Sequence, residues 1–425
     1  MPTTVMTRFL ACAAVLVAVS AGAQVPFVAE TVSIPTNTAG DLAIVWDRGA
    51  SGNEPLIAAG DPLQNGLYVF RVDGGLVQVL PYGAMRGVDS RSNLALGSAP
   101  ATVIAAAAAV TQQVVFGSYA PAGGLTDVTG TAVQSPSASA LTLYRPGDAG
   151  LELFVDNSAG TVRRFVLEDD GSGLIAGTQT GMISLPGVPS AMVVDDRFGT
   201  LYAAIPAQGV FRVDLRTGTP SLLASISGGG FNGNVAGLTF YPLSDGGGLL
   251  LTTVPSQDDV TVHALAGPSR ATFLTRFTVT SGSLTVRGPQ HVDVVPNRMP
   301  GFDAGLFVIH DVAFANYKLV PWEAVATRQP VQLPIEVPED MQAVDAGVDA
   351  GQPDAGERLD AGAGDGGTTD GGARDGGSSG GGGTGPGPQP VEEGCSCSAV
   401  DPFFFPGLFG LWILRRSRRR RVSPS

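Results

Sequence analysis

Two side chains of types that bind metals, a histidine and an aspartate, lie close together in this sequence. His291 and Asp293 are two residues apart in a stretch with strand character. Their side chains would share one face of a strand and could reach the same cation. An isolated strand histidine is more often packed or exposed to solvent, so both interpretations stay open. Lys318 is the only lysine in 425 residues, which raises the question of what it does.

Sequence motifs of several enzyme classes are absent. The three histidines, His263, His291 and His310, lack the spacing of a metalloprotease zinc site. The glycine-rich stretch 227–234 lacks the lysine and the following helix of a phosphate-binding loop. A Gly-x-Ser-x-Gly nucleophile motif does not occur. The local motifs therefore point to none of these enzyme classes.

The charge balance argues against one class of partner. The formal net charge is −13, and six of the 25 basic residues lie in the tail at 415–421. The rest of the chain is therefore strongly acidic. Such a surface repels nucleic acid, whereas it would suit divalent cations if the carboxylates cluster. We expect a monomer that does not bind nucleic acid.

The first 23 residues have the features of a secretory signal peptide. Arg8 precedes an apolar run over 9–19, and small residues at 21–23 form a cleavage site. We expect residues 1–23 to be removed and Gln24 to begin the mature chain. The alternative, a membrane anchor, needs a longer apolar run to span a bilayer. The expected folded region has no cysteine, so an exported domain here would depend on packing or metals for stability.

Short strand patterns fill residues 24–332, which we interpret as one all-β domain. Runs of β-branched and aromatic residues alternate with Gly, Asp and Asn turns, and helical periodicity is nearly absent. The alanine-rich stretch 101–113 is ambiguous, and its flanking valines favour a buried strand with small side chains. Phe-Arg-Val-Asp precedes a turn at both 70–73 and 211–214, a weak internal repeat. Units of roughly 40–50 residues indicate a six-bladed β-propeller, with a large β-sandwich as the alternative.

The composition changes after residue 332. Residues 333–393 consist largely of Gly, Asp, Ala and Pro, so we expect a disordered acidic linker. Residues 394–421 contain Cys395 and Cys397, a short apolar segment and an arginine cluster. This order resembles the MYXO-CTERM tails of myxobacterial surface proteins. The resemblance implies processing near the two cysteines by a dedicated enzyme, and attachment at the outer membrane or cell surface of a Gram-negative bacterium. A permanent short membrane helix is the alternative.

Seven sequence words between residues 40 and 326 occur in the order of the motifs of a known family. They include SAMVVDDRFGTLYAA (190–204), NVAGLTFYP (234–242) and NYKLVPWEAVA (316–326). In these words the chain resembles the β-propeller phytases. The resemblance implies a six-bladed propeller and a calcium-dependent phosphatase of inositol phosphates.

The resemblance also implies a set of site residues at matching positions. Carboxylates would bind calcium, and basic side chains would hold the phosphate. The candidate metal ligands are Asp41, Asp89, Asp293 and Asp311, and the candidate phosphate ligands are Arg91 and Lys318; Asp195 and Asp196 are also retained. For Lys318 the alternative is a side chain whose stem packs on the last blade beside Trp322.

Other charged positions of the family are not retained. The residues that differ from the expected ones are Gly40, Asp61, Ala84, Arg86, Gly87, Ser190, Asn234, Ala236 and Gln290. Each lost carboxylate removes an oxygen ligand and a negative charge, so calcium binding should be weak or lost. We expect a phytase-like propeller with a degenerate calcium and phosphate site that binds an unknown surface ligand or has a structural role. The alternative is an active, divergent 3-phytase that hydrolyses inositol phosphates with calcium.

Overall fold

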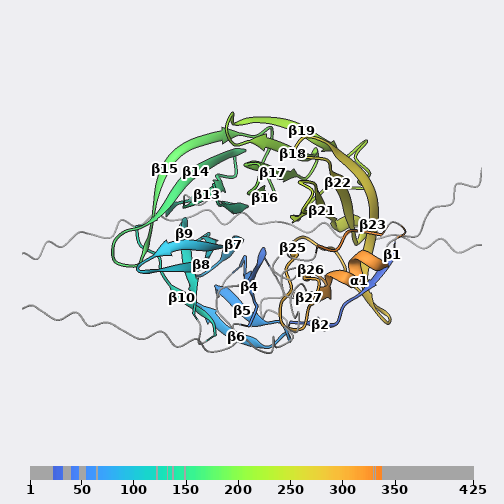
Figure 1. The fold of residues 1–425 in the computed structure, drawn as a ribbon, viewed down its shortest axis with the longest axis horizontal. Coiled ribbons are helices and arrows are strands. Elements are labelled where there is room, and N and C mark those ends of the chain that lie inside the picture. Colours follow the sequence, from blue (N-terminus) through green and yellow to red (C-terminus); the bar gives the residue numbers. More distant parts are fainter. Residues whose placement is uncertain are drawn as a thin grey trace, which may run out of the picture. The chain divides into compact units, whose positions relative to one another are not determined.

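The computed structural model describes residues 23–31, 40–46, 54–63, 66–120, 123–131, 133–135, 138–147, 150–328, 330 and 332–336. Outside these residues lie positions 1–22 of the expected signal peptide (1–23), positions 337–393 of the expected linker (333–393), and the segment with Cys395 and Cys397. Within them the chain is an all-β propeller of six blades (Figure 1), as the strand pattern predicted.

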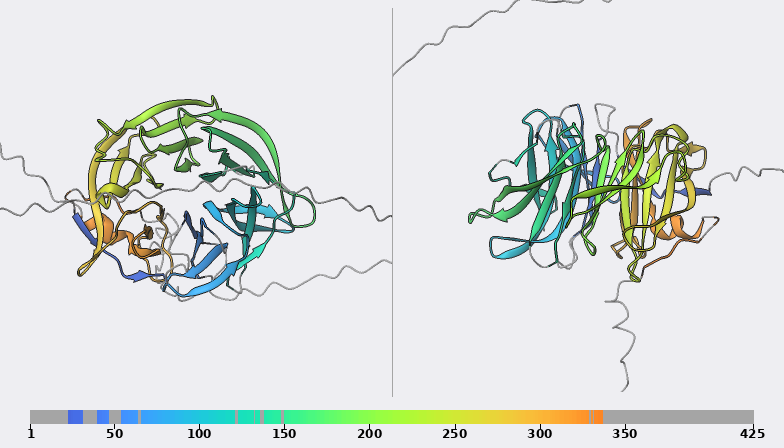
Figure 2. Two further views of the ribbon diagram at one scale, coloured as in Figure 1. Left: turned by 180° about the vertical axis from the view of Figure 1, so that it is seen from behind. Right: turned by 90° about the horizontal axis from the view of Figure 1, so that it is seen from above.

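Six sheets follow one another in a ring, and each sheet is one blade (Figures 1 and 2). A cavity lined by the inner strands marks the central channel. From the channel outward, the first blade consists of β3 (Leu42–Val45), β4 (Leu56–Gly60), β5 (Leu67–Arg71) and β6 (Leu76–Leu80). The second blade consists of β7 (Met85–Leu96), β8 (Ala99–Ala108), β9 (Gln113–Tyr119), β10 (Leu125–Asp127) and β11 (Val133–Gln134). The third blade consists of β12 (Leu141–Tyr144), β13 (Leu151–Asp156), β14 (Thr161–Asp169) and β15 (Ile175–Ser184). The fourth blade consists of β16 (Ala191–Asp195), β17 (Thr200–Ile205), β18 (Gly209–Asp214) and β19 (Thr219–Ser225). The fifth blade consists of β20 (Leu238–Pro242), β21 (Gly248–Val254), β22 (Asp259–Leu265), β23 (Ala271–Ser281) and β24 (Leu284–Thr285). The sixth blade includes β25 (Val292–Val295), β26 (Leu306–Asp311) and β27 (Asn316–Pro321).

The inner strands of the six blades surround the channel and run in one direction. Each blade is an antiparallel meander, and four strands return the chain to the end from which it started. The inner strands are β3, β7, β12, β16, β20 and β25, and each contacts the next around the ring. We call the end where the inner strands begin the upstream mouth of the channel, and the end where they finish the downstream mouth.

The N-terminal strands close the ring. Strand β2 (Ala29–Glu30) pairs with β27 and so supplies the outer strand of the sixth blade. Strand β1 (Ala23–Pro26) pairs in parallel with β23 in the fifth blade, where the side chain of Val25 is fully buried. The segment 23–31 therefore joins two neighbouring blades and covers strand edges that would otherwise be unpaired.

The alanine-rich strand β8 is buried on both faces. Ala105 and Ala107 pack in the core between the second and third blades. Ala106 and Ala108 pack in the core between the first and second blades. Small side chains suit a strand whose two faces are both covered by neighbouring blades. The structure thus confirms the strand interpretation of this stretch, which ends at Ala108.

Helices are sparse in the described part of the chain. They are the short helix α1 (Trp322–Thr327) and the 3-10 turn η1 (Pro255–Gln257). No helix in the described ranges is long and apolar enough to cross a bilayer.

Helix α1 holds the chain end of the propeller in place. Trp322 is fully buried, and its ring stacks on Tyr241 of the fifth blade with centroids 4.2 Å apart. The indole N–H of Trp322 donates to the carbonyl of Pro334 at 3.0 Å, and Leu333 is buried beside it. The chain is therefore still packed on the propeller at 333–336, where the composition predicts the acidic linker to begin.

Candidate functional site

A cavity of about 520 Å³ occupies the central channel. Its lining residues lie on inner strands or just after them, apart from Asp41, which precedes β3, and Thr102, which lies on β8. Of the six residues expected to bind metal or phosphate, four line this cavity: Asp41, Asp89, Arg91 and Asp293. Asp311 and Lys318 are not among its lining residues. The fold thus brings four candidates together and separates two from them.

Asp89 and Arg91 form an ion pair on β7. The carboxylate of Asp89 accepts four hydrogen bonds, from the Ser90 and Leu143 N–H groups, the Thr142 hydroxyl and the Arg91 guanidinium, at 2.7 to 2.9 Å. Four donors match the number of lone-pair sites on a carboxylate. Burial raises the pKa of Asp89, and the positive charge of Arg91 opposes this shift.

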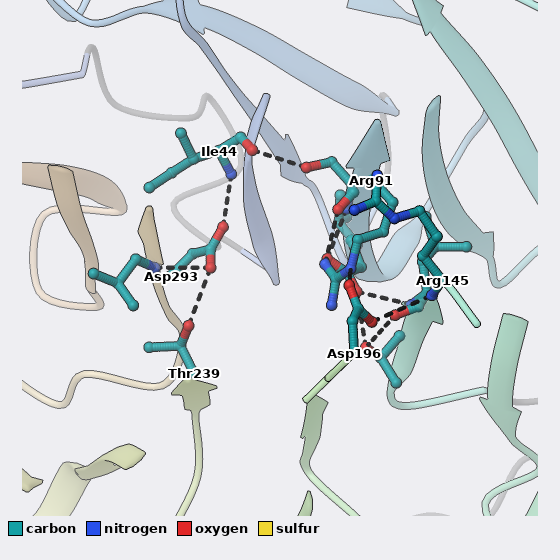
Figure 3. Close-up of polar contacts among 12 residues, drawn as sticks. Ile44, Arg91, Arg145, Asp196, Thr239 and Asp293 are labelled. Carbon is teal, nitrogen blue, oxygen red and sulfur yellow. Dashed lines mark hydrogen bonds and ion pairs between the residues drawn. The ribbon is translucent and has the colours of Figure 1, made fainter. Parts of the chain in front are cut away.

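Arg91 also reaches a second carboxylate on another blade. Its Nε donates to Asp196, which directly follows β16, at 3.2 Å. The other oxygen of Asp196 accepts from the backbone N–H of Arg145 at 3.2 Å. Figure 3 shows Arg91, Asp196 and Arg145 together on one side of the channel. Despite burial, the negative charges of Asp89 and Asp196 raise the pKa of Arg91, which is therefore firmly cationic.

Asp293 lies on β25, on the opposite side of the channel (Figure 3). Its Oδ2 accepts from the N–H of Ile44 at 2.8 Å, and its Oδ1 accepts from the hydroxyl of Thr239 at 3.1 Å. Burial raises the pKa of Asp293 to about 7, and the nearby charge of Asp89 adds to this shift. The Ile44 N–H, which favours the carboxylate form, only partly opposes it. A substantial fraction of this group is therefore protonated near neutral pH.

Asp41 lies at the upstream mouth, next to a pair of histidines. Its carboxylate accepts from the N–H of Val88 at 3.2 Å and lies 3.3 Å from Nδ1 of His291. The ring of His291 stacks on the buried ring of His310, with centroids 5.7 Å apart. Burial lowers the pKa of His310 well below its usual value, which keeps this imidazole neutral. His291 thus lies beside Asp41, whereas Asp293 bonds to the first and fifth blades.

Hydrogen bonds of these side chains join successive blades. Asp41 links the first blade to the second, and Asp89 links the second to the third. Asp196 links the third blade to the fourth. Asp293 links the sixth blade both to the fifth, through Thr239, and to the first. The carboxylates of the cavity therefore have a structural role between the inner strands.

The retained Asp195 has a separate partner. Arg197 Nε donates to its carboxylate at 2.9 Å, and Asp195 is almost fully buried. The guanidinium of Arg197 also donates to the carbonyl of Gly247 at 2.8 Å, which joins the fourth and fifth blades. Within the described ranges, no three or more His, Cys, Asp or Glu residues are grouped so that they could hold a metal ion.

The positions at which this chain differs from the phytase motifs lie outside the cavity lining. None of the nine substituted positions, from Gly40 to Gln290, is a lining residue. At positions 190 and 236 the resemblance expects glutamates. In this chain the hydroxyl of Ser190 donates a hydrogen bond to the carbonyl of Ala236 at 2.6 Å. Ser190 directly precedes β16 and Ala236 lies two residues before β20, so this bond joins the fourth and fifth blades at the upstream mouth.

Lys318 lies within the sixth blade, on β27. Its ammonium group contacts the carboxylate of Glu30 on β2 and lies 3.6 Å from that of Asp311 on β26. It also lies 5.0 Å from the ring centroids of Phe27 and Phe314. The side chain of Lys318 is 2% exposed. Its direct partners are therefore carboxylates and rings of the sixth blade and of the segment that closes it.

Several lining residues were not identified from the sequence. Arg145, Arg197 and Thr239 all line the cavity, and Arg145 and Arg197 lie just beyond the ends of β12 and β16. No local motif marks them. A usable signal is their position, since a polar residue one or two places after an inner strand comes to lie at the downstream mouth.

Comparison with known proteins identifies the family. The family model described as Phytase matches residues 3–350. The 3-phytase of Bacillus subtilis (strain 168) is 22% identical over 286 residues, which cover 62% of this chain and 74% of that protein. The crystal structure of BBS1N in complex with ARL6DN aligns with a TM-score of 0.40 at 10% identity, over 62% of this chain and 74% of that one, a likeness too weak to support an argument. The match over most of the propeller shows that this chain belongs to the Phytase family.

Proposed function

We propose that this chain is an exported, surface-displayed member of the Phytase family whose propeller binds a ligand or supports other surface components. In this proposal it does not act as a calcium-dependent phosphatase. One observation carries the proposal: the cavity carboxylates that the family resemblance assigns to calcium, Asp41, Asp89 and Asp293, already bond to neighbouring blades. Their retention in the sequence is accounted for by the stability of the ring.

The residues present fit a calcium site poorly. Calcium takes six to eight oxygen ligands and depends on the negative charge that they supply. Asp89 already accepts four hydrogen bonds, one of them from the cationic Arg91. Asp293 has its pKa raised to about 7 by burial, so calcium would have to displace a proton from part of the molecules. A cation in the cavity would thus replace existing bonds at a cost in free energy.

The upstream mouth supports the same proposal. The positions where the family resemblance expects two glutamates hold Ser190 and Ala236, which bond to each other. Neither can supply a carboxylate to a cation. Phosphate-ester hydrolysis that depends on calcium needs several such carboxylates to converge on the metal.

The second candidate function is an active, divergent 3-phytase. One observation favours it: Asp41, Asp89, Asp293 and Arg91 line one cavity, with Arg145 at its downstream side. The relatedness to a 3-phytase agrees with this function in general terms. In this case the carboxylates would hold calcium, and the arginines would hold the phosphate of an inositol phosphate.

Surface display is the part of the proposal that concerns localisation. We propose that residues 1–23 direct export, that the acidic stretch 333–393 serves as a tether, and that the segment with Cys395 and Cys397 is recognised by a processing enzyme. The supporting observation is the order of these segments in the sequence. The strand β1 begins at Ala23 and includes Gln24, so cleavage after residue 23 would leave most of this strand intact.

Calorimetry with calcium and an assay of phosphate release would test the proposal. The purified full chain is titrated with calcium, and phosphate release from inositol hexakisphosphate is then measured in the same buffer. We expect neither micromolar calcium binding nor release. Binding together with release, both lost in Asp293→Ala, would instead support the 3-phytase. Thr239→Val is the matched control, because it removes a partner of Asp293 and keeps the carboxylate.

A further inference from the structure

The downstream part of the cavity contains buried polar groups that have no partner among the residues the structure describes. The indole N–H of Trp46 and the hydroxyl of Thr102 are both buried and make no hydrogen bond with any described residue. Both residues line the cavity, and Thr102 is only 3% exposed. An unsatisfied buried donor costs free energy of about 1–3 kcal/mol, so such groups call for an explanation. A bound ligand that accepts their hydrogen bonds would supply one.

Arg145 lies at the same mouth, and its side chain has no polar partner among the described residues. It directly follows β12, and its backbone N–H donates to Asp196. Its guanidinium makes no hydrogen bond or ion pair with the described residues, whereas the cavity's other two arginines, Arg91 and Arg197, are both in ion pairs. Five N–H donors of one guanidinium are therefore available to a ligand.

The backbone opposite Thr102 is irregular in a way that suits a binding site. The register of β7 against β8 shifts between Arg91 and Leu94, which marks a bulge. Within it, Asn93 has a φ of 69°, a left-handed conformation that costs free energy for a residue other than glycine. Asn93 and Ser92 both line the cavity. Bulges commonly redirect side chains next to functional sites.

The available groups indicate the chemistry of the ligand. The indole of Trp46 and the guanidinium of Arg145 can only donate, so the ligand must be rich in acceptors. A guanidinium binds a carboxylate through two parallel hydrogen bonds. A phosphate monoester carries about −1.5 to −2 charges at pH 7 and would meet repulsion from the nearby Asp196, with one unpaired arginine to offset it. A single negative charge is matched by that arginine.

We infer that the downstream part of the channel is a binding site for a small, singly charged carboxylate, held by Arg145 with Trp46 and Thr102 as further hydrogen-bonding groups. The cavity volume of about 520 Å³ is in the range of small-molecule pockets. This site lies at the opposite mouth from the altered positions 190 and 236. It does not depend on whether the chain has lost calcium-dependent hydrolysis.

Binding of defined carboxylates to the full chain tests this inference. The probes are acetate, glycolate, D-gluconate and D-glucuronate, each measured by saturation-transfer NMR and calorimetry in buffer with a calcium chelator. We expect at least one hydroxycarboxylate to bind and to change the fluorescence of Trp46. Inorganic phosphate and inositol hexakisphosphate are measured alongside, and we expect both to bind more weakly. Because the chelator is present, carboxylate binding is read independently of calcium and of phosphate release.

Two variants locate the binding. Arg145→Gln should weaken the affinity about tenfold or more, since a charge-assisted bidentate contact is lost, while the backbone bond to Asp196 is kept. Thr102→Val should also weaken binding but leave stability unchanged or higher, because it replaces an unsatisfied hydroxyl. Arg216→Gln is the control, since this arginine is 83% exposed, and it should bind as the unchanged chain does.

Three outcomes would overturn the inference. The first is that none of the four carboxylates binds at millimolar concentration. The second is that Arg145→Gln and Thr102→Val, both folded, bind as tightly as the unchanged chain. The third is that phosphate or inositol hexakisphosphate binds more tightly than every carboxylate and depends on Arg145.

Discussion

A carboxylate that is retained in a family motif can owe its retention to structure. Asp89 is the clearest case, because each of its lone-pair sites already has a donor, from a neighbouring N–H, a hydroxyl or Arg91. Replacing such a group leaves buried N–H donors without partners, at about 1–3 kcal/mol each. These side chains are therefore costly to lose with or without a metal, and their presence is weak evidence for activity.

The protonation of Asp293 predicts a specific dependence of stability on pH. Burial raises its pKa to about 7 in the folded chain, against about 3.9 for an unperturbed aspartate. Between roughly pH 4 and pH 7 the folded chain keeps a proton that the unfolded chain has lost. The free energy of unfolding therefore falls as the pH rises through this window, by up to about 1.4 kcal/mol per pH unit from this group.

Urea denaturation across this pH window measures the effect. Asp293→Asn should flatten the fall in stability, because the titrating group is absent. Thr239→Val should keep it, because it removes a hydrogen bond to the carboxylate and leaves the carboxyl group in place. An identical pH slope in Asp293→Asn and the unchanged chain would contradict the prediction.

At the scale of elements, the segment 23–31 completes two blades at once. Strand β2 is the outer strand of the sixth blade, and β1 extends the fifth. Lys318 strengthens this closure because its ammonium group lies between Glu30 of β2 and Asp311 of β26. This placement accounts for the one lysine in the chain: a cation is needed where a carboxylate is buried and a strand must be held.

Lys318→Met should lower stability markedly. Methionine fills similar space and leaves the buried carboxylate of Asp311 without its cation. Breaking a buried ion pair from one side typically costs about 3–5 kcal/mol, and protonation of Asp311 would reduce this. We expect a loss of about 3 kcal/mol at neutral pH by chemical denaturation, with partial recovery when Asp311→Asn is added.

Glu30→Gln tests the second carboxylate that contacts Lys318, and its effect on stability is compared with that of Lys318→Met. The side chain of Glu30 is 47% exposed, so solvent screens its interaction with Lys318. Exposed ion pairs typically contribute about 0–1 kcal/mol, and the change should be correspondingly small. If Lys318→Met is as stable as the unchanged chain, the ammonium group of Lys318 does not stabilise the closure of the ring.

At the scale of the whole molecule, the ring separates the two mouths of one channel. The altered family positions 190 and 236 lie at the upstream mouth, where Ser190 bonds to Ala236. The groups of Trp46, Thr102 and Arg145 that have no polar partner in the described part of the chain lie toward the downstream mouth. One mouth can thus change its chemistry while the other keeps a binding site, because each inner strand contributes different residues to its two ends.

Surface display should depend on the two cysteines near the chain end. In a myxobacterial host, we expect Cys395→Ser combined with Cys397→Ser to block processing and reduce the protein accessible to protease on intact cells. The physical reason is that a thiol-containing recognition motif loses its reactive groups. Ser396→Ala is the control and should be displayed normally. If the double variant has the same mass and the same surface display as the unchanged chain, this result would argue against processing at this motif.

Sequence alone was sufficient for the architecture. Strand propensity, turn residues and repeat length are local properties, since they depend on neighbours in the chain. They predicted an all-β chain with six blades, and the family words agreed with the Phytase match. Even the ambiguous alanine stretch was correctly interpreted as a strand, because its flanking valines are local information as well.

The partners of the charged side chains were decided by tertiary structure. Ile44 and Asp293 are 249 residues apart, and Lys318 and Glu30 are 288 apart, so closure of the ring is what brings each pair into contact. Sequence placed Lys318 and Asp311 with the other candidates, while the blade order puts them away from the cavity lining. Arg145 carries no motif, yet its position after β12 puts it at the downstream mouth. Local patterns specify which residues form strands, but the geometry of the closed ring determines which side chains meet.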